Sequence, residues 1–358
     1  MSIEFDEFKS TDGLSQQREL FEDAFPEHVG TPATSTEHYE WKFHGSPFSP
    51  PSYEYSAIEG SRMLGYYAAI PYPYQIGERT MVAGMVCDVM THSEARGRGV
   101  FTELGRFALS KMEAANLDFV TGYPIRPEVM GGHLRVGWQV AFDLPMFLRP
   151  LKASAIAKSK RVSWLAPVAN VGIAIYQALL APRPTADEYQ SRRGSPRELL
   201  HSAPFETFLE NWSATVENHL VKSAEFYDWR LSAPGTQYHA FLVYRNDAVV
   251  AAAVGREARL HGIPSFALLD VMVLKGDESA LPTLYHDVDG EARRRGAEAI
   301  VTMMSGQRAR EYRLTRFGFL KSPFTFKLIL RSLNDRVAVE RISTEKDWHL
   351  MWIDSDDL

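Results

Sequence analysis

The sequence is poor in cysteine and carries little excess charge. Its 358 residues include one cysteine, Cys87, which excludes an internal disulfide and indicates a reducing compartment. No signal-peptide pattern opens the chain, so we expect a cytoplasmic protein. The formal charge of −6, from 45 acidic and 39 basic residues, gives no overall electrostatic footprint for nucleic acid. The eleven histidines show no metal-ligand spacing, so we expect no metal.

A long uninterrupted hydrophobic run is also missing. The most apolar stretch, residues 162–181, is interrupted by Pro167, Asn170 and Gln177, which favours a broken helix over a membrane span. Three basic residues precede it: Lys158, Lys160 and Arg161. We therefore expect a helical connector at 151–200 that either covers the domains on its two sides or contacts a membrane surface or a partner.

The chain has enough apolar residues for two cores. Its length suits two ordinary domains, and 45% of its residues are hydrophobic. Aromatic residues make up 12%, which argues against a disordered or fibrous protein.

The most informative feature is an internal repeat. Four short motifs recur in the same order: Tyr39–Phe43 as Tyr227–Leu231, Cys87–Met90 as Leu269–Met272, Val120–Thr121 as Val301–Thr302, and Arg135–Trp138 as Arg316–Phe319. The copies are separated by 181 to 188 residues, a nearly constant offset that chance does not readily produce.

Each copy has the same predicted order of elements: three strands joined by short turns, a helix, a strand, a second helix and a final strand. This order implies an α/β fold, with a mixed, mostly antiparallel sheet and flanking helices. We therefore predict one domain at 1–150, the connector at 151–200, and a second domain with a C-terminal tail at 201–358.

The two copies differ most at the turn between their third strand and first helix. In the first copy the turn contains Arg96-Gly97-Arg98-Gly99, and in the second, 274–280, it contains one glycine, two acids and no arginine. Glycines let backbone N–H groups approach an anion closely, and the following helix N-terminus adds free N–H groups. Arginines add charge-assisted hydrogen bonds. The first turn therefore predicts a pyrophosphate site, whereas the second should repel one.

The stretch DVMTHSEARGRGVFTEL resembles the coenzyme-binding motif of the GNAT (Gcn5-related N-acetyltransferase) superfamily, R-x-x-G-x-G/A between a strand and a helix. The resemblance covers residues 15–150 and, more faintly, 205–332, which implies tandem GNAT domains with a degenerate second half. It implies that acetyl-coenzyme A binds through two sets of residues. The first set, Val89, Met90 and Thr91, offers backbone groups to the pantetheine arm and thioester. The second set holds the pyrophosphate: Arg96, Gly97, Arg98, Gly99, Val100, Phe101 and Thr102. The sequence departs from the family motif at Phe101, where a small residue is usual.

The resemblance also implies a reaction. A neutral amine attacks the thioester carbonyl, a strand N–H stabilises the oxyanion, and the departing thiolate takes a proton. Many family members use a tyrosine for that proton. The matching position here is His133, which can exchange a proton near neutral pH, and the second copy has Leu314 there.

Three further residues are candidates for the site. Asp88 lies on the central strand and could act as a base, but Asp270 holds the same place in the copy without the loop, which favours a shared structural bond. Tyr72 and Tyr123, each followed by proline at an expected strand end, are candidates for substrate binding.

The sequence therefore favours an acetyl-coenzyme A-dependent N-acyltransferase acting on an amine of a small or sugar-like acceptor. Two alternatives stay open: a non-catalytic module that binds or senses coenzyme A, and an aminoacyl or peptidyl transferase with duplicated GNAT folds. The glycine-arginine turn argues against the second alternative. Neither the acceptor nor the oligomeric state can be inferred from the sequence.

Overall fold

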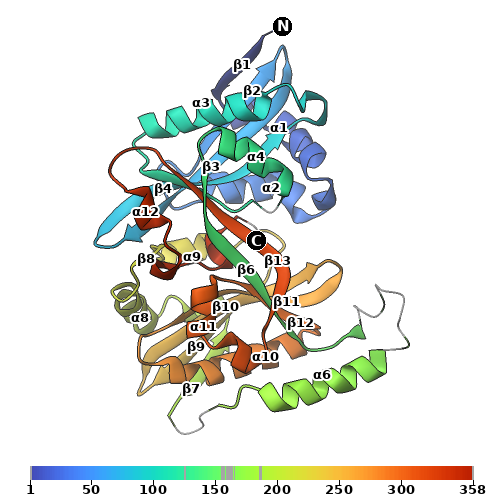
Figure 1. Cartoon of the computed structure of the whole chain (residues 1–358), viewed down its shortest axis with the longest axis vertical. Coiled ribbons are helices and arrows are strands. Elements are labelled where there is room, and N and C mark those ends of the chain that lie inside the picture. Colours follow the sequence, from blue (N-terminus) through green and yellow to red (C-terminus); the bar gives the residue numbers. More distant parts are fainter. Residues whose placement is uncertain are drawn as a thin grey trace. The chain divides into compact units, whose positions relative to one another are not determined.

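The computed structural model describes residues 2–124, 126–154, 158, 164, 166–184 and 188–356. These residues form two compact units, each a sheet with flanking helices (Figure 1). Unit 1 consists of Met1–Phe142, Ala233–Gly235 and Lys327–Thr344. Unit 2 consists of Asp143–Ser232, Thr236–Phe326 and Glu345–Leu358.

In unit 1 the sheet runs in the order β1-β2-β3-β4-β5-β13. Strands β1 to β4 are antiparallel neighbours, β5 is parallel to β4, and β13 is antiparallel to β5. The elements are β1 (Ile3–Glu7), α1 (Ser10–Ala24), α2 (Thr36–Tyr39), β2 (Tyr53–Glu59), β3 (Arg62–Ile76), β4 (Arg79–Thr91), α3 (Val100–Ala114), β5 (Phe119–Gly122), α4 (Pro127–Arg135), the end of β13 (Leu320–Ser332) and α12 (Val339–Ile342).

In unit 2 the sheet runs in the order β6-β12-β11-β10-β9-β7. Strands β9 to β11 form an antiparallel meander, β12 is parallel to β11, and β6 and β7 pair antiparallel with β12 and β9. The elements are β6 (Gln139–Pro150), α6 (Ala166–Leu180), β7 (Gln190–Gly194), α7 (Pro196–Leu199), α8 (Ala203–Ser213), β8 (Asn218–Leu220), α9 (Ala224–Arg230), β9 (Tyr238–Arg245), β10 (Ala248–Leu260), β11 (Ile263–Val273), α10 (Leu281–Arg294), β12 (Ala299–Met303), α11 (Gly306–Glu311) and β14 (Trp348–His349).

The prediction of an α/β fold with mixed, mostly antiparallel sheets and flanking helices is confirmed. The order of elements also recurs as predicted: β2-β3-β4-α3-β5-α4-β6 in the first half and β9-β10-β11-α10-β12-α11-β13 in the second.

The compact units, however, are not the contiguous stretches 1–150 and 201–358, because the halves exchange their last strands. In unit 1, Phe119–Gly122 of β5 pairs with 329–332 of β13. In unit 2, Ala299–Met303 of β12 pairs with 146–150 of β6. The region expected to be a helical connector is only partly helical, since its residues Gln190–Gly194 form strand β7.

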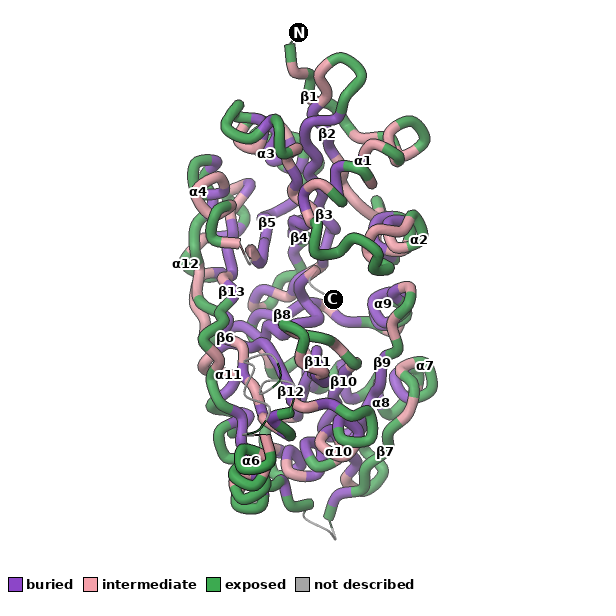
Figure 2. Tube along the Cα trace, turned by 90° about the vertical axis from the view of Figure 1, so that its right-hand side faces the viewer, coloured by how far each residue is buried: buried purple, intermediate pink, exposed green. Residues whose placement is uncertain are grey.

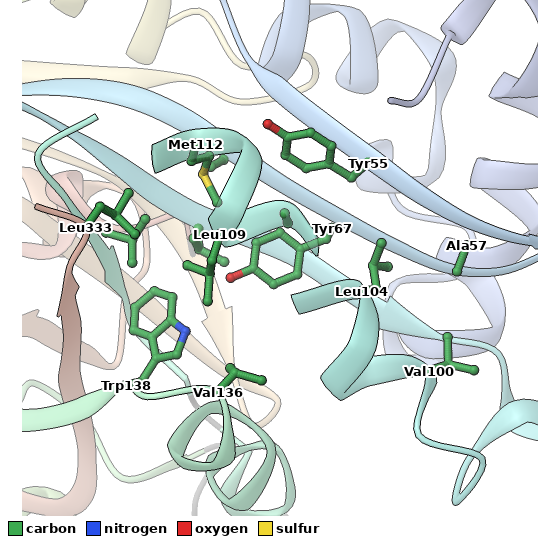
Figure 3. Close-up of a cluster of buried hydrophobic side chains, with 14 of the residues drawn as sticks. Tyr55, Ala57, Tyr67, Val100, Leu104, Leu109, Met112, Val136, Trp138 and Leu333 are labelled. Atoms are coloured by element: carbon green, nitrogen blue, oxygen red, sulfur yellow. The ribbon is translucent and has the colours of Figure 1, made fainter. Parts of the chain in front are cut away.

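Helix α3 is amphipathic and covers one face of the unit 1 sheet. Val100, Leu104, Ala108 and Met112 recur at a helical spacing of four and are buried against strand residues such as Tyr67 (Figure 3). The helix approaches β3 closely because Gly65 has no side chain: a Cβ there would lie 3.0 Å from Val100 Cγ1. This packing fixes the N-terminus of α3 at the end of β4.

Candidate functional site

The backbone of the loop between β4 and α3 takes left-handed φ angles at its two glycines. Gly97 and Gly99 have φ angles of +80° and +84°, in the left-handed region that side-chain-bearing residues rarely adopt. A Cβ built on either residue would meet no atom within 4 Å. The loop is therefore open on the side that these glycines face, and a ligand can approach its backbone.

This loop offers backbone donors to an anion. Thr102 and Glu103 donate their N–H groups to the carbonyl oxygen of Gly99, which begins the helix. Among the described residues, no acceptor is found for the N–H groups of Gly97, Gly99 and the two residues that follow it. Free N–H groups in a glycine turn and at a helix N-terminus are suited to binding a phosphate.

The two loop arginines differ in availability. Arg98 forms a bidentate pair with Glu59, with Nη2–Oε1 and Nη1–Oε2 distances of 2.6 and 3.2 Å. The hydrogen bond from Arg98 lowers the pKa of the Glu59 carboxyl. Arg96 is exposed and makes no ion pair within the described part of the chain. Arg96 is thus free to meet a ligand, whereas Arg98 must first leave Glu59.

Neighbouring elements hold the start of the loop. Asp23, at the end of α1, accepts hydrogen bonds from the Ser93 N–H at 2.7 Å and the Ser93 hydroxyl at 2.8 Å. Partial burial opposes ionisation of Asp23, but the bonds from Ser93 outweigh it and lower the pKa of Asp23. Arg62 donates to Glu94 at 2.6 Å. No local pattern in the sequence pointed to Asp23, because 70 residues separate it from its partner Ser93.

Strand β4 is irregular where the loop begins. Asp88 has φ +46°, and the pairing with β3 shifts register between Cys87 and Met90. This geometry is a β-bulge, which takes Asp88 and Val89 out of the regular pairing. On its other side, among the described residues, β4 pairs with β5 only from Ala83 to Met85. The C-terminal end of β4, including Val89, Met90 and Thr91, therefore has an edge that does not pair with β5.

Asp88 is ionised and paired rather than free. Its carboxylate lies 2.8 Å from Lys42 Nζ, and both side chains are about nine-tenths buried. Burial works to raise the pKa of Asp88, but Lys42 and then Arg18 outweigh it and hold the pKa below its usual value. Asp270 has an equivalent bond, 2.8 Å from Lys222 Nζ. A buried carboxylate–lysine pair in both units fits the structural bond that the repeat suggested.

His133 lies on α4 between two aromatic rings. Its ring centroid is 5.1 Å from that of Phe101 and 5.2 Å from that of Trp138, both edge to face. The residue is 6% exposed, and Nδ1 has no hydrogen-bond partner among the described residues. Burial lowers the pKa of His133 to about 4, so the imidazole is neutral at neutral pH.

Phe101, which replaces the small residue of the family motif, fits because α4 has a glycine opposite it. A Cβ on Gly132 would lie 2.3 Å from Phe101 Cε1. The phenyl ring therefore occupies the space of the missing side chain. The pair Gly131-Gly132 was the signal for this packing, and sequence reasoning did not connect it with Phe101.

Gly132→Ala is accordingly expected to lower the free energy of unfolding by about 1 kcal/mol net. Overpacking costs about 1–3 kcal/mol, and the better helix propensity of alanine returns up to about 1 kcal/mol. Gly131→Ala is the matched control, because its Cβ would meet only Arg135 Nη2, at 3.6 Å. Urea unfolding measures both. Equal effects of the two substitutions, or no rescue of Gly132→Ala by Phe101→Ala, would contradict this packing.

The two candidate tyrosines are both buried. Tyr72 is wholly buried in unit 1, with its ring centroid 5.7 Å from that of Phe48. Tyr123 follows β5 and is 5% exposed. Neither presents its ring on the surface, so any contact with an acceptor needs a side chain to move.

The buried Thr91 hydroxyl has no hydrogen-bond partner among the described residues.

The corresponding loop of unit 2 already contains its own anions. The N–H of Gly276 donates to Glu278 Oε1 at 3.1 Å. Asp277 is buried and pairs with Arg245, with an Oδ1–Nη1 distance of 2.5 Å. The residue matching His133, Leu314, is fully buried. A pyrophosphate at this loop would meet two carboxylates, where unit 1 offers N–H groups that have no acceptor in the described part of the chain.

Among the described residues, no helix is both long and apolar enough to cross a membrane. The part of the stretch 162–181 that the structure describes, Trp164 and 166–181, includes helix α6. Lys160 and Arg161, which precede it in the sequence, lie outside the described residues.

Comparisons with known proteins agree with this geometry. A family model described as an acetyltransferase (GNAT) domain matches residues 9–141. A GCN5-related N-acetyltransferase from Anabaena variabilis aligns at 12% identity with a TM-score of 0.65, covering 93% of this chain and 73% of that one. A conserved protein from Enterococcus faecalis, described as a probable N-acyltransferase, aligns at 11% identity with the same TM-score and coverages.

Saccharomyces cerevisiae N-myristoyltransferase, solved with bound myristoyl-CoA, aligns at 12% identity with a TM-score of 0.62 and covers 92% of this chain and 79% of that one. A comparison with curated proteins finds no match. Identities this low show a shared fold and do not identify a substrate. Residues 9–141 thus form a domain of the GNAT acetyltransferase family, and the chain has the fold of the GCN5-related N-acetyltransferases over about 93% of its length.

Proposed function

We propose that this chain is an N-acyltransferase that uses acetyl-coenzyme A and passes the acyl group directly to an amine of a small or sugar-like acceptor. The observation that carries the proposal is the contrast between the two loops. In unit 1 the N–H groups of Gly97 and Gly99 have no acceptor among the described residues, whereas in unit 2 the N–H of Gly276 donates to Glu278. The GNAT match over 9–141 supports a general acyltransferase role for the first loop.

The residues of unit 1 fit the parts of the coenzyme. The backbone N–H groups of Gly97, Gly99, Val100 and Phe101 suit the pyrophosphate, with Arg96 as the available cation. The uncovered edge of β4 at Val89, Met90 and Thr91 suits the amides of an extended pantetheine arm, much as an exposed strand edge takes up a peptide. Thr102 lies in the first turn of α3, and its N–H already donates to the carbonyl oxygen of Gly99 at 3.0 Å.

Two groups would serve the transfer itself. A strand N–H at the bulge would stabilise negative charge on the thioester oxygen. His133 is the candidate for exchanging a proton with the departing sulfur. Because burial keeps its ring neutral, His133 would first take the proton that the attacking amine loses and then pass it to the departing thiolate. A thiolate forming beside it would raise the pKa of His133, since an adjacent anion favours the imidazolium. Asp88 is a weaker candidate for the base, because Lys42 lowers its pKa and so makes its carboxylate less basic.

Titration calorimetry with acetyl-coenzyme A is the experiment that tests the proposal. We expect one coenzyme per chain, bound at residues 89–102. Lys275→Ala, in the exposed loop of unit 2, should leave affinity within about twofold, because surface substitutions usually change free energies by under ~0.5 kcal/mol. Two equivalent sites, or a tenfold loss of affinity in this variant, would contradict a degenerate second loop.

Turnover with a panel of amines then separates an enzyme from the alternatives. Saturable binding of acetyl-coenzyme A without acyl transfer to any amine would favour a binding or sensing module. Transfer from aminoacyl donors without coenzyme binding would favour the peptidyl-transferase alternative. Longer acyl-coenzyme A donors belong in the same panel, because the yeast structure that shares the fold holds myristoyl-CoA.

His133→Phe should lower kcat by about 10²- to 10⁴-fold, the usual loss when a positioned proton donor is removed. Phenylalanine is the informative substitution because it keeps an aromatic ring between Phe101 and Trp138. His133→Tyr should restore part of the rate and move the acid limb of the pH profile, while coenzyme affinity stays unchanged in both variants. A wild-type kcat in His133→Phe would mean that His133 serves only in packing and that solvent exchanges the proton.

A further inference from the structure

Helix α6 lies on the surface with its polar side chains inward and an apolar face exposed, the reverse of the usual arrangement. Its polar side chains face the protein: Gln177 is buried, and its Nε2 donates to the carbonyl oxygens of Pro150 and Leu151 at 2.7 and 3.0 Å. Gln177 Oε1 accepts from Arg293 at 2.8 Å, and Asn170 Oδ1 accepts from the Ala153 N–H at 2.7 Å. These bonds fix which side of the helix lies against unit 2.

The opposite side of α6 is apolar and exposed. The exposed fractions of Val168, Val171, Ile175 and Leu179 are 72, 61, 59 and 77%. Their spacing of three or four residues puts them on one face of the helix. Figure 2 colours most of α6 as exposed. Trp164, just before the helix, is 77% exposed. Five of the eleven exposed large hydrophobic residues found among the described residues thus fall between 164 and 179. A patch of this kind on a soluble protein marks an interaction surface.

The charge around α6 indicates what that surface meets. From Leu144 to Ala186 the sequence contains six lysines and arginines and no aspartate or glutamate. The described ones that are exposed flank the helix on both sides: Lys152, Lys158 and Arg183. Fifteen residues of helix span about 22 Å, too short for the roughly 30 Å hydrocarbon core of a bilayer. An apolar face with a tryptophan, flanked by basic residues without acids, is typical of a helix that lies in the interface of an anionic membrane.

We propose that α6 docks this protein on anionic lipid surfaces, with the face formed by Trp164, Val168, Val171, Ile175 and Leu179 inserted among the headgroups. This surface is separate from the coenzyme loop, so lipid binding does not depend on the proposed activity. The polar bonds of Asn170 and Gln177 keep the helix attached to unit 2 while its apolar face meets the bilayer.

Vesicle co-sedimentation of the full chain tests the proposal. We expect the protein to sediment with phosphatidylcholine–phosphatidylglycerol vesicles, to do so less as salt is added, and to stay in solution with phosphatidylcholine alone. The triple variant Val171→Gln/Ile175→Gln/Leu179→Gln should bind at least about tenfold more weakly, because each buried aliphatic side chain contributes a large part of the affinity. The double variant Leu320→Gln/Phe324→Gln is the control, since these residues are 51 and 52% exposed elsewhere in unit 2 and should not affect binding.

Circular dichroism and thermal midpoints check that each variant is folded. No sedimentation with the anionic vesicles, or equal sedimentation of the folded triple variant, overturns the proposal. Sedimentation velocity without lipid tests the alternative that a second copy of the chain covers this face. If the protein does not bind vesicles but forms a dimer, and the triple variant is monomeric, the face is a dimer interface.

Discussion

Gly99→Val is expected to weaken acetyl-coenzyme A binding by at least about a hundredfold. The new side chain would project into the open space from which a phosphate must approach the loop N–H groups. Loss of two charge-assisted hydrogen bonds, each contributing about 1.5–3 kcal/mol, is sufficient for this change. Valine at φ +84° also strains the backbone, so the free energy of unfolding should fall by about 1–2 kcal/mol. Calorimetry and urea unfolding measure the two effects separately.

Gly262→Val is the matched control for backbone strain. Gly262 has φ +81°, and a Cβ there would also meet no atom within 4 Å, but it lies in the turn between β10 and β11 of unit 2. The two variants should lose similar stability, and only Gly99→Val should lose coenzyme affinity. Wild-type affinity in Gly99→Val would mean that the pyrophosphate does not bind at this loop.

Lys222→Met is expected to lower the free energy of unfolding by about 3–5 kcal/mol, because it leaves buried carboxylates without their cation. Lys222 Nζ lies 2.8 Å from Asp270 Oδ2 and 3.4 Å from Asp354 Oδ1, and all three side chains are at most 1% exposed. Urea unfolding at neutral pH measures the loss. Lys275→Met removes an exposed lysine of the same unit and should change stability by less than about 0.5 kcal/mol.

The loss in Lys222→Met should also depend on pH. Burial raises the pKa of Asp354 to about 6, although Lys222 opposes the shift. The pKa of Asp354 in the folded protein is thus above the value of about 3.9 in an unfolded chain, so the folded state favours the protonated acid. The stability that this protonation contributes is lost as pH rises from about 4 through 6. Without the lysine, the pKa of Asp354 loses its main opposing influence and should rise further. The deficit of the variant should therefore be largest at neutral pH and shrink towards pH 4, and a deficit independent of pH would contradict this account.

The repeat and the loop were predictable because their signals are local in sequence. Gly97 and Gly99 stand between a strand and an amphipathic helix, so the turn could be placed before any contact was known. The acid shared by both copies, Asp88 and Asp270, was also recognisable as structural. Its lysine partners were not, because Lys42 lies within the repeated motif Tyr39–Phe43 while Lys222 precedes the corresponding motif at Tyr227.

Long-range pairing accounts for most of what sequence reasoning missed. No local pattern says that Arg331 pairs with Val120, because a strand carries the same period-two pattern whichever partner it has. The contiguous domain boundaries followed from assuming that each half keeps its own last strand. The inward direction of Asn170 and Gln177 was similarly hidden, since these residues interrupt an apolar run in the sequence but form its attachment to unit 2 in the structure.

The exchanged strands determine when each unit can finish folding during synthesis. The sheet of unit 1 is complete only with residues 329–332, so the first 142 residues leave the ribosome long before their last strand exists. At about 5–20 residues per second, the ribosome needs roughly 10–40 s to make the intervening chain. During that time the edge of β5 is unpaired, and an unpaired strand edge is a site where nascent chains aggregate. Chaperone demand in this protein should therefore be concentrated on its N-terminal half, even though that half is translated first.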